Sequence, residues 1–233
     1  MPRLPRVVLP GQPHHLIQRG NNRSPIFFHP HDYHFFLDCL LDASQRYSCQ
    51  IHAYVLMTNH IHLLVSPETE TALAGLMQSV GRRYVQYVNR RCQRTGTLWE
   101  GRYRAVLIDA DPYVLTCYRY IELNPVRAQM VSDPAAYPWS SYGHNAHGQS
   151  NPLLHAHALY RALGPDTSRR CQAYRALFAQ ELDEERLQAL RQATNTGWVL
   201  GRERFKADVE ADLQRRVRPL PRGGRRPGAG RPK

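Results

Sequence analysis

The sequence of 233 residues lacks the features expected of a secreted or membrane-spanning protein. It has only 5 cysteines and none of them stands in a C-x-x-C spacing, which argues against a disulfide framework and a cysteine-based zinc site. No run of about 18 apolar residues occurs, and the N-terminal stretch returns to proline after a few apolar residues. We therefore expect a protein of a reducing, cytoplasmic compartment.

Lysine and acidic residues are also scarce. Arginine supplies 29 of the 31 basic residues against 19 acidic ones, which leaves a net charge of +12. The excess is +4 in residues 1–150, zero in 151–212 and +8 in 213–233. The planar guanidinium group pairs with phosphate oxygens and stacks on bases, so nucleic acid is the leading partner. The alternative is an ordinary solvated surface with the arginine bias of a GC-rich genome.

The hydrophobic periodicity of the first part predicts strands and helices in the order β-α-β-β-α-β, followed by one more helix. This order is typical of an α+β ferredoxin-like sandwich, whose four-stranded antiparallel sheet has its first and third strands in the middle. The expected strands are 13–19, 50–57, 60–65 and 103–108, and the expected helices are 30–47, 73 to about 96, and 109 to about 130.

The rest of the chain differs in character. Residues 137–152 are loop-rich, and helices are expected near 155–163, 168–179, 183–193 and 201–215. We expect three parts: residues 1–147, a helical region 148–216, and a disordered basic DNA-binding tail 217–233 without aromatic residues.

His60-Ile61-His62 is the sharpest local pattern. Side chains at positions i and i+2 of a strand point to the same face, so both imidazoles emerge together while Ile61 turns the other way. Two neutral imidazoles can chelate a divalent metal. Among 12 histidines such a pair also arises by chance, and an ordinary surface or hydrogen-bonded pair is the alternative.

Tyr120 and Asn124 lie four residues apart in the third predicted helix, which also holds Tyr113 and Tyr118. A tyrosine can attack a phosphodiester, and an asparagine can give a metal its amide oxygen. The alternative is aromatic core packing with a helix break at Asn124-Pro125.

Three blocks then carry a family resemblance: Val55–Val65 (VLMTNHIHLLV), Thr95–Tyr103 (TGTLWEGRY) and Arg119–Ala128 (RYIELNPVRA). In this order and spacing they resemble the signature blocks of the REP-associated tyrosine transposases, relatives of the single-tyrosine HUH transposases. The resemblance covers roughly residues 10–145. Residues 197–205 and the basic tail resemble C-terminal extensions of some members.

The resemblance implies that His60 and His62 ligate a divalent metal ion, Mg2+ or Mn2+, that Asn124 completes the metal site, and that Tyr120 is the nucleophile. It implies cleavage and rejoining of single-stranded DNA with hairpin-forming repeats, through a 5′-phosphotyrosyl intermediate, in the nucleoid of a bacterium. Glu122 stands where members often have another polar residue, frequently histidine. Its role as a metal neighbour, a specificity residue or neither is left open.

Contacts to DNA are expected from arginines in or beside these blocks and from one tryptophan that could stack a base: Arg19, Arg83, Arg102, Arg104, Arg127 and Trp99. An ordinary surface role is the alternative for each. A monomer acting in cis is favoured over a dimer that exchanges the tyrosine helix. The other functions considered are a non-catalytic nucleic-acid-binding regulator and a metal-dependent hydrolase, which would not need Tyr120.

Overall fold

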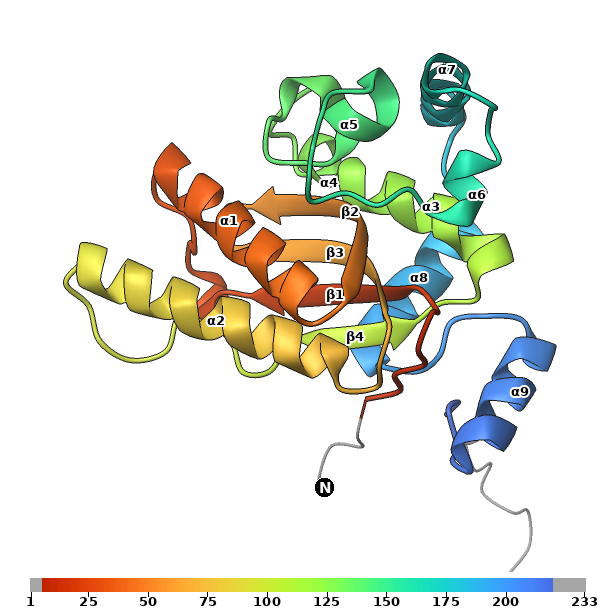
Figure 1. Cartoon of the computed structure of the whole chain (residues 1–233), viewed down its shortest axis with the longest axis horizontal. Coiled ribbons are helices and arrows are strands. Elements are labelled where there is room, and N and C mark those ends of the chain that lie inside the picture. Colours follow the sequence, from red (N-terminus) through yellow and green to blue (C-terminus); the bar gives the residue numbers. More distant parts are fainter. Residues whose placement is uncertain (1–5, 220–233) are drawn as a thin grey trace, which may run out of the picture.

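The computed structural model describes residues 6–219, which form a four-stranded antiparallel sheet with helices on both faces (Figure 1). The strands are β1 (His14–Arg19), β2 (Cys49–Met57), β3 (His60–Pro67) and β4 (Arg104–Leu107). Their order across the sheet is β2-β3-β1-β4, so β1 and β3 are central. The predicted α+β ferredoxin-like sheet is therefore confirmed.

One face of the sheet is covered by α1 (Pro30–Arg46) and α2 (Ala72–Arg91). Successive side chains of a strand point to opposite faces of the sheet. Leu16 of β1 and Ile61 and Leu63 of β3 point toward α1 and α2 and are buried in the core between the sheet and these helices. A capping box begins α1, in which the Asp32 carboxylate accepts hydrogen bonds from the backbone amides of Phe28 and His29.

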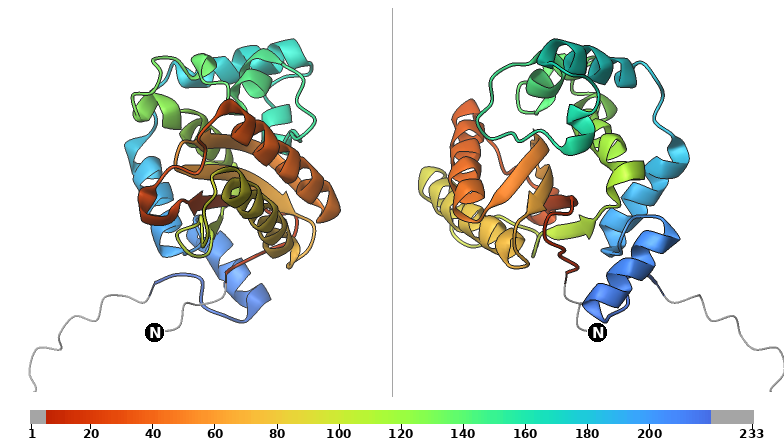
Figure 2. Two further views of the ribbon diagram at one scale, coloured as in Figure 1. Left: turned by 90° about the vertical axis from the view of Figure 1, so that its left-hand side faces the viewer. Right: turned by 45° about the vertical axis from the view of Figure 1, so that its right-hand side comes forward.

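The opposite face is covered by α3 (Ala110–Glu122) and by helices from the C-terminal half, and Figure 2 shows the sheet between the two helical layers. The core on this side joins Val55 and Leu64 of the sheet to Tyr118 of α3 and to Tyr174 and Leu190 of later helices. These helices are α5 (Tyr142–His147), α6 (Ala158–Arg161), α7 (Thr167–Phe178) and α8 (Glu184–Thr196). The helical region thus shares a core with the sheet, and a domain boundary at residue 147 stays a prediction.

The third helix is shorter than predicted. It ends at Glu122 and is followed by a short α4 (Asn124–Arg127), whereas one helix to about Met130 was expected. Pro125 has no amide hydrogen to continue the ladder. The side-chain amide of Asn124 instead donates to the carbonyls of Tyr120, at 2.7 Å, and Ile121, at 3.3 Å. The loop-rich stretch 137–152 also contains α5, and 3-10 turns occur at Asn21–Arg23 and Pro134–Ala136.

The described C-terminal part ends with α9 (Glu203–Leu213) and a short irregular segment, residues 214–219. Val217 is buried with Val7, Leu107, Val199 and Val209, and its carbonyl accepts a hydrogen bond from the amide of Val199 at 3.1 Å. The prediction that disorder begins at residue 217 is therefore wrong for 217–219, because a valine in this small core holds them. The rest of the predicted tail, residues 220–233, lies outside the described residues. No helix within residues 6–219 is long and apolar enough to cross a membrane.

Candidate active site

The imidazoles of His60 and His62 lie on the α3 face of β3, as the alternation predicts, while Ile61 between them is buried in the opposite core. Their ring centroids are 5.0 Å apart and the rings are nearly perpendicular. Strand geometry alone therefore brings the two rings together on the side of the sheet that α3 covers.

A chain of hydrogen bonds beneath His62 decides which of its nitrogens carries a proton. The Thr194 hydroxyl donates to the carbonyl of Leu190 at 2.7 Å, so its oxygen accepts from Nδ1 of His15 at 3.0 Å. Burial lowers the pKa of His15 to about 3 and that of His62 well below its ordinary value, so both rings are neutral and carry one proton each. Nε2 of His15 therefore accepts from Nδ1 of His62, 2.8 Å away. The Nε2 lone pair of His62 is left free.

The same logic applies to His60. Asn59 donates its side-chain amide to the carbonyl of Arg23 at 2.9 Å, and its Oδ1 accepts from Nδ1 of His60 at 2.6 Å. Burial, aided by the charge of Arg19, lowers the pKa of His60 to about 4, so this ring is neutral as well. Both histidines thus hold an unprotonated Nε2, which is the form that binds a divalent metal.

Tyr120 lies directly against this pair. Its ring meets His62 and His15 edge to face, with both centroids 5.7 Å away, and the residue is 8% exposed. The guanidinium carbon of Arg127 lies 4.9 Å from the centre of the Tyr120 ring. Arg127 lies on α4, directly after the end of α3. One chain therefore assembles two histidines, a tyrosine and a cation in one place.

Two imidazoles do not complete the coordination of a metal ion, which needs further ligands. Within residues 6–219 no group of three or more His, Cys, Asp or Glu side chains is placed to hold a metal ion. Asn124 uses its amide hydrogens on the carbonyls of Tyr120 and Ile121, which leaves its Oδ1 as an acceptor. Two imidazoles with free lone pairs suit a divalent cation whose remaining positions are filled by oxygen atoms, and Oδ1 of Asn124 stays a predicted ligand.

Glu122 has a different environment from its neighbours on α3. Its buried carboxylate accepts hydrogen bonds from Ser141, from Asn145 at 2.8 Å and from Tyr174 at 2.6 Å. Burial raises its pKa to about 7, although these three hydrogen bonds oppose the rise. All three donors belong to the segment after α4. Glu122 therefore ties α3 to the C-terminal helices and does not contact the two histidines of β3.

Of the residues predicted to contact DNA, four lie around this site. Arg19 is the β1 partner of His60 in the sheet register, and Arg127 covers Tyr120. A groove of about 300 Å3, here called the arginine groove, is lined by Arg19, Arg23, Arg102 and Arg104 together with Ile17, Glu100 and Asn195.

The other two predicted DNA contacts lie elsewhere. Arg83 is on α2, which covers the opposite face, and forms an ion pair with Asp42 at 2.8 Å. The backbone of Trp99 pairs with Gly20, but its side chain packs against the core beneath α1 and α2, beside Tyr84. The structure therefore does not bring Arg83 and Trp99 to the histidine pair.

The sequence reasoning missed His15 and Thr194. A signal for His15 was present, because it shares a strand face with Ile17 and Arg19 and that strand was expected beside the one with the two histidines. Thr194 lies 179 residues further along the chain and gave no local signal.

Known proteins resemble the chain in sequence over residues 11–124 and in fold. The family profile described as "Transposase IS200 like" matches residues 11–124, which include both histidines, Tyr120 and Asn124. The solved structure of a REP-associated tyrosine transposase bound to a REP hairpin superposes with a TM-score of 0.54 at 18% identity, covering 67% of this chain and 93% of that chain. A Deinococcus radiodurans R1 protein described as a candidate transposase gives a TM-score of 0.37 at 18% identity, covering 55% of this chain and 92% of that chain. No curated protein sequence matches significantly.

Proposed function

Residues 11–124 belong to the IS200-like transposases, and on this premise we propose that the chain cleaves and rejoins single-stranded DNA at hairpin-forming repeats, as a REP-associated transposase. The single observation that carries the proposal is the contact of the Tyr120 ring with His62, at 5.7 Å between centroids, within one chain. A structural tyrosine would not need two neutral histidines with free lone pairs beside it.

In the proposed reaction the Tyr120 oxygen attacks the scissile phosphorus, and a new P–O bond forms as the phenolic proton leaves. The bond between phosphorus and the 3′ oxygen breaks, and that oxygen takes up a proton to become a 3′-OH. The 5′ phosphate of the fragment downstream of the cut stays esterified to Tyr120, so the energy of the phosphodiester is kept for rejoining. A divalent cation, Mg2+ or Mn2+, bound by His60 and His62 would polarise the phosphate.

The protein groups around Tyr120 have their own parts in this scheme. Arg127 lies over the tyrosine ring, and its positive charge favours the charge that develops on the phenolic oxygen and on the phosphate. Arg19 stands beside His60 in the sheet, where it would attract the same phosphate. Since the tyrosine and the histidines come from one chain, the arrangement supports cleavage in cis by a monomer.

The test uses a hairpin-bearing single-stranded oligonucleotide labelled at its 3′ end, incubated with Mg2+, with Mn2+ or with a chelator. We expect the wild type to give a labelled covalent adduct on a denaturing gel, and only with metal. Tyr120→Phe removes one oxygen and should abolish the adduct while it still binds the DNA. Tyr113→Phe, on the same helix, is the matched control and should cleave normally.

An adduct formed by Tyr120→Phe would move the nucleophile elsewhere. Metal-dependent cleavage without any adduct would indicate a hydrolase, and binding without cleavage under all conditions would indicate a non-catalytic regulator.

A further inference from the structure

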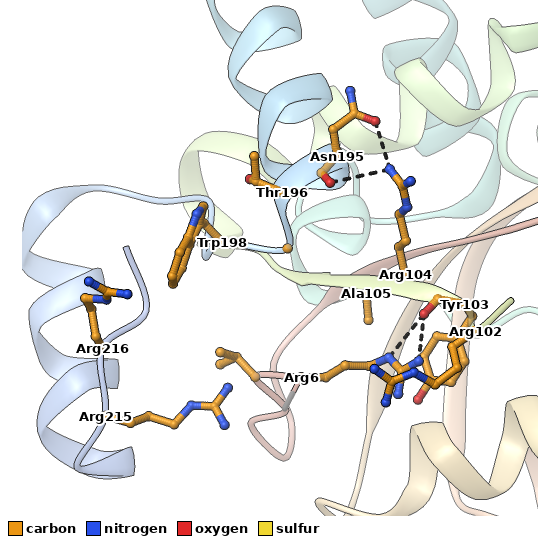
Figure 3. A pocket seen from close by; sticks show the side chains of 12 residues that line it. Arg6, Arg102, Tyr103, Arg104, Ala105, Asn195, Thr196, Trp198, Arg215 and Arg216 are labelled. Atoms are coloured by element: carbon orange, nitrogen blue, oxygen red, sulfur yellow. Dashed lines mark hydrogen bonds between the residues drawn. The ribbon is translucent and has the colours of Figure 1, made fainter. Parts of the chain in front are cut away.

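A second cavity lies beyond the arginine groove, where the edge strand β4 meets the C-terminal part of the chain (Figure 3). Its volume is about 320 Å3, within the range of small-ligand pockets. We call it the Trp198 pocket and define it by six of its lining residues: Arg6, Tyr103, Arg104, Asn195, Trp198 and Arg216.

The Trp198 pocket combines aromatic rings with guanidinium groups. The guanidinium carbon of Arg6 lies 3.7 Å from the centre of the Tyr103 ring, and that of Arg216 lies 5.3 Å from the centre of the Trp198 ring. Figure 3 shows these two pairs on opposite sides of the cavity. Two flat cation-and-ring stacks facing one space provide surfaces on which a planar aromatic ligand can stack.

The positive charge of the residues that line the Trp198 pocket favours an anionic ligand. Five arginines and no acidic side chain are found among the described residues that line it. Among residues 6–219, Arg104 donates to two oxygens of Asn195, to Oδ1 at 3.2 Å and to the carbonyl at 3.4 Å, and neither of these partners neutralises its charge. A planar group attached to a phosphate, which is a nucleotide, fits both properties.

The backbone is shaped to present Trp198. Gly197 ends α8 in the left-handed region, with φ of 79°, and its amide bonds the carbonyl of Ala193 at 2.7 Å. This conformation suits glycine and turns the chain sharply off the helix axis. Trp198 then lies half-buried at the pocket, and Val199 and Leu200 after it are buried against the sheet edge.

The sheet register connects the pocket to the candidate active site. His62 pairs with Ile17, and Ile17 pairs with Arg104, so the three side chains share one face of the sheet. Adjacent strands lie about 4.8 Å apart, which places the backbones of His62 and Arg104 about 10 Å from each other. Arg102, Arg104 and Asn195 line both the arginine groove and the Trp198 pocket. A basic path therefore runs across the sheet from the histidines to Trp198.

We propose that the Trp198 pocket binds an unpaired nucleotide of the DNA strand that is cut at Tyr120, with its base stacked on Trp198 and its phosphate held by Arg104. This inference rests on the proposed function for the identity of the strand. The pocket positions DNA at a distance from the reacting phosphate, and the C-terminal extension thereby contributes to substrate selection.

The experiment measures binding, not cleavage, and uses the full chain with Tyr120→Phe so that no strand is cut. The probes are a fluorescent hairpin with single-stranded flanks and the same hairpin without flanks. Loss of one base stack corresponds to a roughly 5- to 150-fold weaker affinity. We expect Trp198→Ala to weaken binding of the flanked hairpin by a factor in this range and to leave the hairpin without flanks nearly unaffected, whereas Trp198→Phe keeps most of the affinity.

Arg104 is tested against a matched charge control on the opposite face. Arg104→Ala should lower the slope of log affinity against log salt by about 0.7, the value for one lost contact to a single strand. Arg82→Ala removes an exposed arginine of α2 and should leave that slope unchanged. Thermal unfolding of each variant identifies any that fails to fold, and Trp198→Phe then carries the comparison.

Unchanged affinity of a folded Trp198→Ala for the flanked hairpin would overturn the proposal, as would an equal loss for both probes. Competition by polyglutamate as strong as by a single-stranded oligonucleotide would also overturn it, because the pocket would then serve an acidic protein partner. None of these outcomes depends on cleavage, so a failure of the proposed nuclease activity would be seen separately in the adduct assay.

Discussion

His62 donates a hydrogen bond from Nδ1 to Nε2 of His15, and this bond leaves the other nitrogen of His62 free to hold a metal. The bond depends on Thr194, because the threonine hydroxyl makes His15 a donor on its other side. Thr194 lies on α8, outside the part of the chain that matches the transposase profile. The C-terminal helical region therefore reaches beneath the two histidines and fixes the protonation of one of them.

Replacement of Thr194 by valine should weaken metal binding. The change removes the oxygen that accepts the Nδ1 proton of His15, so the tautomers of His15 and His62 are no longer fixed. Loss of such a hydrogen-bond partner of a metal ligand commonly costs about 10- to 100-fold in metal affinity. Calorimetric titration with Mn2+ measures the effect directly. Thr194→Ser keeps the hydroxyl and should bind nearly as the wild type does. Equal affinities of the valine and serine variants would mean that the relay does not matter for the metal.

Arg127→Ala should slow formation of the covalent adduct by roughly tenfold, about 1.4 kcal/mol of lost stabilisation of the transition state. The guanidinium lies over Tyr120 but is itself exposed, so the folded structure should change little. Single-turnover cleavage with saturating hairpin DNA is the measurement. Arg127→Lys keeps the charge and should recover part of the rate. A rate unchanged in Arg127→Ala would exclude the arginine from the reaction.

The stability of the protein should fall in mild acid, and His52 should account for part of the loss. Its Nδ1 donates to the carbonyl of His155 at 2.7 Å, and its Nε2 accepts from Ser66 at 2.9 Å. Burial lowers its pKa to about 4 from the ordinary 6.5. The unfolded chain therefore binds more protons than the folded one between these values, and stability is lost as pH falls below about 6.5.

From this shift we expect His52 to contribute a loss of about 2 kcal/mol between pH 7.5 and pH 5. His52→Asn retains a donor near Nδ1 but does not titrate. Urea unfolding at the two pH values should show a smaller difference for this variant than for the wild type. Equal differences for the two proteins would show that His52 is not protonated on unfolding.

Two truncations should separate the charge of the C-terminus from its packing. Deletion of residues 220–233 removes five basic residues and should lower the salt slope of binding to single-stranded DNA by at most about 3.5, with the melting temperature unchanged. Deletion of residues 213–233 also removes the buried Val217 and should lower the melting temperature. Equal melting temperatures for the two truncated chains would contradict a structural role for Val217.

Local patterns in the sequence were enough for the sheet, since the alternation in β1 and β3 and the helical spacing in α1 and α2 correspond to the observed faces. The same alternation put His60 and His62 on one side. What local patterns could not supply were contacts across long separations, such as His15 with Thr194 or Glu122 with Tyr174. The sequence did carry a signal for the end of the third helix, because Pro125 lacks an amide hydrogen, and the Asn124 side chain donates to the carbonyl of Ile121 in its place.

Residues from outside the sheet form hydrogen bonds at the outer edge of β4, and these bonds limit pairing between the sheets of two molecules. An open sheet normally exposes unpaired backbone groups along its outer strand, and these invite pairing with another molecule. Here the carbonyl of Tyr103 accepts from Arg6, and the carbonyl of Leu107 accepts from the amide of Leu200 at 2.9 Å. The outer edge of β4 is therefore already bonded at both of its ends, by Arg6 and by Leu200. A chain cut before Trp198 would expose this strand, and self-association through it should follow.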